Sequence, residues 1–189
     1  MDKLRQIDYD IVYIHMAENM SSLSHAIRSK VGCVIVSEDG QMISQGFNGM
    51  PKGFSNVCEN VIDSFGNIVY ITPSNVSDSL KIEHIKQTLL DNPTYSLVTR
   101  PEVLHAETNA ITKCAKLMAS TMNATIYVTL SPCFECSKFI IQAGIHRVVF
   151  LELYHNTDGL DLLSQAGIIV QQIDIKNKKL IDYGNITKK

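Results

Sequence analysis

Apolar residues recur along the chain with two periods, one typical of helices and one typical of strands. Residues 4–20 repeat apolar side chains at helical spacing, which predicts an N-terminal helix. The β-branched run 31–37 and the segment 41–49 are separated by the turn sequence Asp39-Gly40. That arrangement predicts two antiparallel strands joined by a hairpin.

The second half of the chain alternates helical and strand patterns. Helices are predicted at 105–120, 136–144 and 158–167, and strands at 124–130, 146–153 and 168–174. Such alternation implies parallel strand pairs, right-handed crossovers and helices on both faces of the sheet. We therefore expect an α/β protein with three layers, α/β/α, around a five-stranded mixed sheet.

The middle of the chain carries a weaker pattern. Within it, residues 78–93 predict a short helix that ends at Asn92-Pro93. Because 60–100 has few apolar positions, we expect an insertion without a core of its own, inside a single domain over 1–189. The polar residues 176–189 are expected at the surface.

Composition narrows the classes of protein that fit. Hydrophobic residues make up 45% of the chain and charged residues 19%, and the net charge is −2, which argues against a nucleic-acid polymer as partner. Acidic residues interrupt the apolar positions near the N-terminus, so we expect neither a signal peptide nor a membrane span. The odd number of cysteines, five, then favours a reducing, cytoplasmic setting.

Two cysteines three residues apart, Cys133 and Cys136, follow Pro132 at a predicted junction of strand and helix. By itself the pair is compatible with redox exchange, metal binding or packing. His105 begins the preceding predicted helix, and adjacent parallel units bring helix N-termini to one sheet edge. His105, Cys133 and Cys136 are therefore the predicted ligands of a catalytic zinc ion with an open fourth position. Glu107 is the predicted catalytic residue, placed to accept a proton from zinc-bound water.

The segments HAE and PCFEC match the H-x-E and P-C-x-x-C signature of the zinc nucleobase deaminases, which the chain resembles. With GFNGMPKGFSNVCEN and the tyrosine of LELYHN, residues 5–174 look like the deoxycytidylate (dCMP) deaminases and their cytidine-deaminase-like fold, less so over 60–100. The resemblance implies hydrolytic deamination of dCMP to dUMP by zinc-bound hydroxide. Glu107 would be the proton shuttle, and the product would feed pyrimidine nucleotide biosynthesis.

The same resemblance implies a substrate site. The predicted substrate-binding residues are Asn48, Ala106, Tyr154, Arg28 and His155. By resemblance, Asn48 and Tyr154 are expected to contact the base and the sugar of the substrate. Arg28 and His155 are the candidates for the 5′-phosphate, ahead of Arg100 and Arg147.

The resemblance also implies regulation. Such deaminases commonly form hexamers that dCTP activates and dTTP inhibits, with Mg²⁺ on the regulatory nucleotide. The predicted allosteric loop contains Gly49, Pro51 and Gly53. Some relatives hold a second, structural zinc, but here only Cys58, His84 and His25 remain for it, so we do not expect one.

Other functions stay open at this point. They are a related deaminase of tRNA adenosine, of a nucleoside such as cytidine or of a riboflavin precursor, and an inactive nucleotide-binding relative. The tRNA adenosine deaminases share the zinc signature, whereas the nucleoside enzymes typically have a cysteine in place of His105. The absent basic excess disfavours tRNA, whose binding relies on neutralised phosphates, and Glu107 disfavours an inactive protein. Two other cysteines, Cys33 and Cys114, are expected in the core. Asn48 is also compatible with a left-handed turn.

Overall fold

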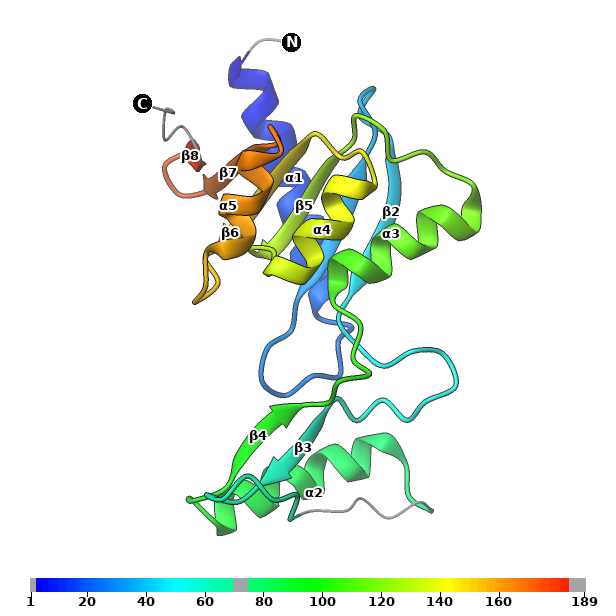
Figure 1. Ribbon diagram of the computed structural model, residues 1–189, viewed down its shortest axis with the longest axis vertical. Helices are drawn as coiled ribbons and strands as arrows, with labels where there is room; N and C mark the ends of the chain where they lie inside the picture. The colour runs from blue at the N-terminus through cyan, green and yellow to red at the C-terminus, as the bar shows by residue number, and fades with distance from the viewer. Residues whose placement is uncertain (1–2, 70–74, 184–189) are drawn as a thin grey trace. The chain divides into compact units, whose positions relative to one another are not determined.

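The computed structural model describes residues 3–69 and 75–183 (Figure 1). The chain divides into two compact units. The larger unit comprises residues 1–24, 31–48 and 105–189, and the smaller unit comprises 25–30 and 49–104. The expectation that 1–189 forms a single domain stays a prediction.

A six-stranded mixed sheet, in the order β2-β1-β5-β6-β7-β8, forms the centre of the larger unit. Its strands are β1 (Gly32–Val36), β2 (Met42–Phe47), β5 (Thr125–Leu130), β6 (Arg147–Glu152), β7 (Ile169–Asp174) and β8 (Lys179–Tyr183). Strand β1 pairs antiparallel with β2 and β5, whereas β5, β6 and β7 are parallel and β8 returns antiparallel.

The predicted mixed sheet is confirmed, but the number of five strands is wrong. Residues 179–183, expected as part of a polar surface tail, form the edge strand β8. Of its apolar side chains, Leu180 and Tyr183 are partly buried and Ile181 is exposed, because an edge strand has a neighbour on one side alone. The Tyr183 ring nevertheless packs against Phe150, with ring centroids 5.3 Å apart.

Helices cover both faces of this sheet, as predicted (Figure 1). Helix α1 (Lys3–Ser21) packs on one face, over a core that includes Ile14 and Tyr127. Helices α3 (Ala106–Leu117), α4 (Phe134–Gln142) and α5 (Asp158–Gln165) cover the other face. The core beneath them contains Cys33 and Cys114, so both cysteines are packing residues as expected.

The strand directions bring several segments of the chain to one edge of the sheet. Parallel pairing places Leu130 of β5 opposite Glu152 of β6, so both strands end at this edge. Strand β2 ends there too, because both β2 and β5 are antiparallel to β1. Each of the helices α3 and α4 runs back against its neighbouring strand, so both helices begin at this edge.

On the face of the sheet that α1 covers, a buried polar network ties this helix to the strands. Asp10 is fully buried and accepts hydrogen bonds from Arg147 Nη1 at 2.8 Å and Nη2 at 2.7 Å, and from the Tyr127 hydroxyl at 2.7 Å. Gln171 accepts a further bond from Arg147 Nε at 2.9 Å. Arg147 is therefore committed to the α1 face, and its candidacy as a phosphate contact is wrong.

The smaller unit contains β3 (Glu59–Ile62) paired antiparallel with β4 (Ser96–Thr99), and α2 (Asp78–Asp91), which confirms the predicted helix. The two short strands were not expected. An apolar cluster of Val57, Val61 and Ile85 lies within this unit. The expectation that this region lacks a core of its own is therefore wrong.

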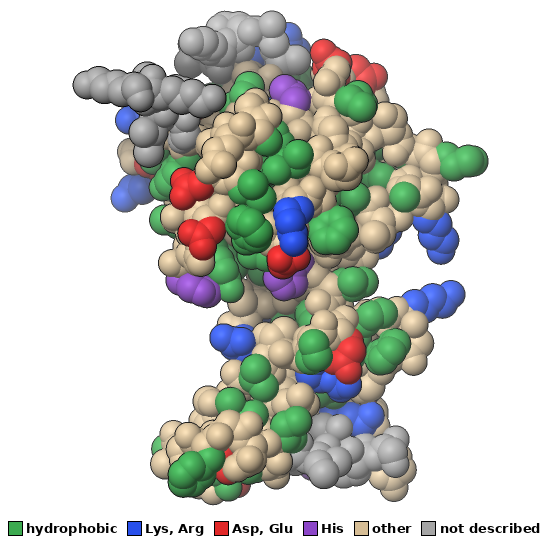
Figure 2. Space-filling model, viewed as in Figure 1, with side chains coloured by type: hydrophobic (Ala, Val, Ile, Leu, Met, Phe, Trp, Pro, Cys, Tyr) green, Lys and Arg blue, Asp and Glu red, His purple; other side chains and the backbone are tan. Residues whose placement is uncertain are grey.

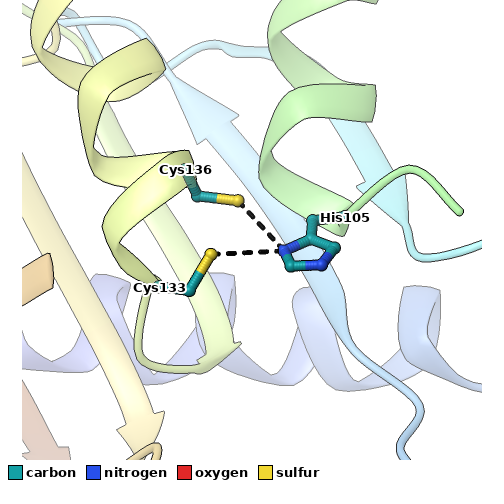
Figure 3. Close-up of side chains that lie close together, drawn as sticks. All are labelled: His105, Cys133 and Cys136. Carbon is teal, nitrogen blue, oxygen red and sulfur yellow. Dashed lines mark hydrogen bonds between the residues drawn. The ribbon is translucent and has the colours of Figure 1, made fainter. Parts of the chain in front are cut away.

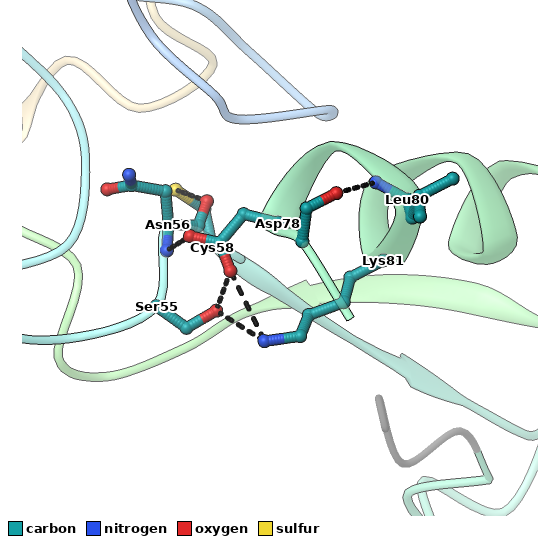
Figure 4. A network of polar contacts seen from close by, with 7 residues as sticks. Ser55, Asn56, Cys58, Asp78, Leu80 and Lys81 are labelled. Carbon is teal, nitrogen blue, oxygen red and sulfur yellow. Dashed lines mark hydrogen bonds and ion pairs between the residues drawn. The ribbon is translucent and has the colours of Figure 1, made fainter. Parts of the chain in front are cut away.

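The start of α2 is fixed by its first acidic residue (Figure 4). Asp78 accepts hydrogen bonds from the Ser55 hydroxyl at 2.6 Å and the Asn56 amide at 2.7 Å, and pairs with Lys81 at 3.3 Å. The Ser55 bond is the main cause that lowers the pKa of Asp78.

Within residues 3–69 and 75–183, no helix combines the length and the apolar character needed to cross a membrane.

Candidate metal centre and active site

Two helix starts bring His105, Cys133 and Cys136 together at the sheet edge described above (Figure 3). The Cys133 sulfur lies 3.4 Å from His105 Nδ1, and the Cys136 sulfur lies 3.3 Å from the same nitrogen. Within the described residues these three form the one group of potential metal ligands, with donor atoms within 4.8 Å of one another. The structure thus places the three predicted ligands side by side.

The local conformation explains why these side chains are available. His105 is the N-cap of α3 and Cys133 is the N-cap of α4, both with extended backbone, and neither side chain caps its helix. Cys136 stands three residues after Cys133, on the same face of the first turn. All three donor atoms therefore point away from the helix ends and toward one another.

These residues fit a zinc ion. Zinc binds imidazole nitrogen at about 2.0–2.1 Å and thiolate sulfur at about 2.3 Å, so tetrahedral N and S ligands lie about 3.6 Å apart. The observed separations of 3.4 and 3.3 Å are close to that value. Three protein ligands leave a fourth position for water or substrate, as in catalytic zinc sites.

The surroundings favour a thiolate at the first cysteine. The hydrogen bond from the Cys136 thiol, helped by His105, lowers the pKa of Cys133 to about 4. The same hydrogen bond, together with burial, raises the pKa of Cys136. A thiolate at Cys133 suits a metal ligand, because zinc is bound by thiolates and its binding releases thiol protons.

Glu107 lies in the first turn of α3, one position beyond Ala106, and its side chain is only 4% exposed. Burial raises the pKa of Glu107 to about 7. Glu107 follows the predicted ligand His105 by two residues, and the charge of His105 acts on its carboxyl group. A buried acid beside the ligand cluster is the arrangement expected of a group that moves a proton.

Asn48 follows the end of β2 at the same edge of the sheet. Its Oδ1 accepts a hydrogen bond from the Val31 amide at 2.8 Å. Among the described residues other than glycine, positive φ occurs only at Met118, Asn123 and Lys178, so a left-handed turn does not explain Asn48. The side chain of Asn109 donates to the Phe47 carbonyl at 2.9 Å and thereby ties α3 to this loop. Sequence reasoning missed Asn109, although it belongs to the same HAETN segment.

Tyr154 follows the end of β6, and one hydrogen bond connects its backbone to the segment that carries Cys133. The Tyr154 amide donates to Ser131 Oγ at 2.8 Å, two residues before Cys133. The Tyr154 ring packs against His155, with centroids 3.9 Å apart, and His155 is exposed. Ser131 was not predicted, because its role depends on a contact across 23 residues of chain.

The other predicted residues belong to the smaller unit. Arg28 is exposed, its guanidinium donates to Thr99 Oγ1 at 3.0 Å, and its amide donates to the buried Glu59 carboxylate at 3.2 Å. Gly49 pairs with Leu104, and Gly53 has a positive φ of 97° in the turn that begins at Pro51. Burial raises the pKa of Cys58 to about 11, and its thiol donates to the Asn56 carbonyl. The phosphate-binding role of Arg28 and the regulatory role of the loop with Gly49, Pro51 and Gly53 therefore stay predictions.

Comparison with known families decides the relationship of the chain. Residues 8–152 match the family model described as the cytidine and deoxycytidylate deaminase zinc-binding region. The chain belongs to this family. The matched region includes all three predicted metal ligands and Glu107.

Relatives within the cytidine and deoxycytidylate deaminase family align over nearly the whole chain. Deoxycytidylate deaminase of Enterobacteria phage T4 is 33% identical over 185 residues, which cover 93% of this chain and 95% of the relative. The human deoxycytidylate deaminase is 31% identical over 167 residues, covering 85% and 78% of the two chains. The crystal structure of dCMP deaminase from the cyanophage S-TIM5 in complex with dCMP and dUMP is 32% identical. It covers 88% of this chain and 97% of its own, with a TM-score of 0.66, and confirms the cytidine-deaminase-like fold.

Proposed function

We propose that the protein is a zinc-dependent hydrolase that deaminates dCMP to dUMP. The observation that carries the proposal is the grouping of His105, Cys133 and Cys136 beside the buried carboxyl of Glu107. The choice of substrate is supported by relatives at 31–33% identity that are named deoxycytidylate deaminase, and by the S-TIM5 enzyme, whose structure contains dCMP and dUMP.

The residues of the chain divide the work of this reaction. A zinc ion held by the three ligands would act as a Lewis acid that makes water nucleophilic near neutral pH. Glu107 would accept the first proton of this water and deliver it to N3 of the cytosine ring. It would then take the second proton from the hydroxyl on C4, as the C4 carbonyl forms, and deliver it to the amine, which leaves as ammonia. Because Glu107 is buried, the proton stays in the site instead of exchanging with bulk water.

Substrate contacts are proposed for residues at the same sheet edge and in the smaller unit. Asn48 follows the end of β2 and Ala106 is the first residue of α3, so both lie at the sheet edge that carries the predicted zinc ligands. Tyr154 is tied to the segment that carries Cys133. We assign the base and deoxyribose to these three residues. Arg28 and His155 are assigned to the 5′-phosphate, on the strength of charge and family resemblance.

Regulation belongs to the same proposal. We assign activation by dCTP and inhibition by dTTP, with Mg²⁺ on the nucleotide, to a homo-oligomer that is a hexamer by resemblance. The support is the loop that contains Gly49, Pro51 and Gly53, whose sequence resembles the regulatory loop of related enzymes.

The decisive test is Glu107→Gln, which keeps the shape of the side chain and removes its acid. We expect one zinc per chain to remain, and ammonia release from dCMP to fall by roughly 10²–10⁴-fold, the usual contribution of a general acid–base group. Glu135→Gln is the matched control, because Glu135 precedes Cys136 in the chain but is exposed and pairs with Lys138. It should leave turnover unchanged. Undiminished turnover in the Glu107 variant would refute the assigned proton transfer.

The substrate is tested by comparing ammonia release from dCMP, dCTP, deoxycytidine and a tRNA anticodon stem-loop, with and without dCTP or dTTP plus Mg²⁺. Fast turnover of dCMP alone supports the proposal. Equal turnover of deoxycytidine would remove the phosphate roles of Arg28 and His155. Absence of turnover for all of them, with zinc bound, would refute the proposed activity.

A further inference from the structure

Helix α5 makes an unusually close approach to the start of α4. Gly159, the second residue of α5, is buried against the backbone that carries Cys133. A β-carbon at position 159 would lie 2.8 Å from the carbonyl carbon of Cys133 and 2.8 Å from Ser137 Oγ. It would lie closer still to the carbonyl oxygen of Pro132, inside van der Waals contact. Only a glycine fits this contact without displacing its neighbours.

The atoms that Gly159 faces are those that set the position of Cys133. The Pro132 carbonyl belongs to the peptide group before the Cys133 α-carbon, and the Cys133 carbonyl belongs to the one after it. The Cys133 carbonyl also accepts hydrogen bonds from the amide and the hydroxyl of Ser137, each at 3.0 Å. A shift of this backbone would therefore move the Cys133 sulfur relative to His105 and Cys136.

Backbone conformation does not explain the glycine. The described glycines with positive φ are Gly40, Gly53, Gly66, Gly144 and Gly167, so Gly159 has a φ that any residue can adopt. Within a helix, glycine is about 1 kcal/mol less favourable than alanine. The chain thus gives up helix stability at position 159, and the observed gain is the missing β-carbon against Cys133.

The same segment is held on its other side by the chain that follows β6. The Ser131 amide donates to the Glu152 carbonyl at 2.8 Å, and Ser131 Oγ accepts from the Tyr154 amide at 2.8 Å. Residues 131–133 are therefore enclosed between the end of β6 and the start of α5. This enclosure leaves the backbone of a metal ligand little room to adjust.

We propose that Gly159 is a positioning residue for the metal ligand Cys133. This inference rests on the proposed zinc site, and it assigns to α5 a role in setting ligand geometry. Protein ligands must meet a metal within about 0.2 Å of their ordinary distances, so a backbone displacement of a few tenths of an ångström changes the coordination. Gly159 itself touches neither metal nor substrate.

The test is Gly159→Ala, loaded with Co²⁺ and examined by absorption spectroscopy. We expect a folded protein whose thiolate-to-cobalt and d–d bands differ from those of the native protein. Zinc affinity, measured by competition with a chromophoric chelator, should fall roughly 10–100-fold, as it does when groups supporting a metal ligand are changed. Gly144→Ala is the control, because its strained position at the far end of α4 lowers stability without touching Cys133. It should keep the native cobalt spectrum.

The inference would be overturned if Gly159→Ala kept the native cobalt bands and the native zinc affinity. Its melting temperature would then rise, as it does when alanine replaces glycine in an ordinary helix. If the variant does not fold, Ser137→Ala supplies the test, since it removes the hydroxyl bond to the Cys133 carbonyl. A native cobalt spectrum in that variant would then count against the inference. Failure of the proposed function is distinguishable, because the native protein itself would then bind no zinc or release no ammonia from dCMP.

Discussion

Replacing Arg147 by methionine should destabilise the larger unit strongly while leaving the metal centre intact. The methionine side chain would fill much of the same space, but the fully buried Asp10 would lose its cation. Removing one partner of a buried ion pair costs about 3–5 kcal/mol, because the remaining charge is desolvated and uncompensated. The hydrogen bonds that Asp10 receives from Tyr127 and Gln6 place the expected cost near the lower end of that range.

The measurement is equilibrium urea unfolding followed by circular dichroism, with hydrogen exchange of β5 and β6 amides to identify the larger unit. For a chain of this size, 1 kcal/mol shifts the melting temperature by about 2–4 °C, so a cost near 3 kcal/mol should also lower the melting temperature by about 6–12 °C. Zinc content of the folded variant should be native, since Arg147 lies on the face covered by α1 and the ligands lie at the starts of α3 and α4.

The double variant Asp10→Asn with Arg147→Met isolates the physical cause. Asparagine keeps an acceptor for Tyr127 and removes the buried charge, so most of the lost stability should return. Lys178→Met is the control for an exposed pair, because both Lys178 and its partner Asp8 are more than half exposed, and it should change stability little. A cost below about 1 kcal/mol for Arg147→Met, or a double variant no more stable than the single one, would refute the reasoning.

Two further predictions concern the substrate contact of Asn48 and the pH dependence of the Asp78 interactions. Asn48→Asp keeps an oxygen that can accept the hydrogen bond from the Val31 amide, so stability should change little while ammonia release falls. Asn48→Ala should also lose about 0.5–1.5 kcal/mol of stability. Native turnover in Asn48→Asp would contradict a substrate contact. The lowered pKa of Asp78 means that its carboxylate stabilises the folded smaller unit above about pH 4 and loses that contribution as the pH falls through the folded pKa. Asp78→Asn should therefore lower the urea midpoint at pH 7 and have little effect near pH 2, and an equal loss at both pH values would contradict this explanation.

The parts of the fold that could be predicted from the sequence are those with strong local signals. The strands at 125–130 and 147–152 consist mostly of apolar residues. The helices before β6 and β7 are followed by Gly144 and Gly167, whose φ values are 71° and 79°. Left-handed glycines after helices are a reliable stop signal. The metal ligands could be predicted because the residue types and the parallel topology agree.

What could not be predicted depends on partners far away in the chain. The strands β3 and β4 have four residues each, too few to show a period, and β8 alternates weakly at a sheet edge. The pairing of Asp10 with Arg147 spans 137 residues, and nothing near either residue signals it. Ser131 and Asn109 likewise act through backbone groups of distant segments, which leave no mark on their own surroundings.

The candidate site nevertheless contains residues that do not fit the usual residue preferences of helices. Helix N-caps favour Ser, Thr, Asp or Asn, and losing such a cap costs about 1 kcal/mol, yet the N-cap of α3 is His105 and that of α4 is Cys133. Gly159 breaks helix preference in the same neighbourhood, while Gly144 and Gly167 obey the rule for helix ends and lie elsewhere. A chain gives up local stability where another requirement outweighs it. In this protein three such departures converge on one pair of cysteines and a histidine, which makes ligand geometry the requirement that best explains them together.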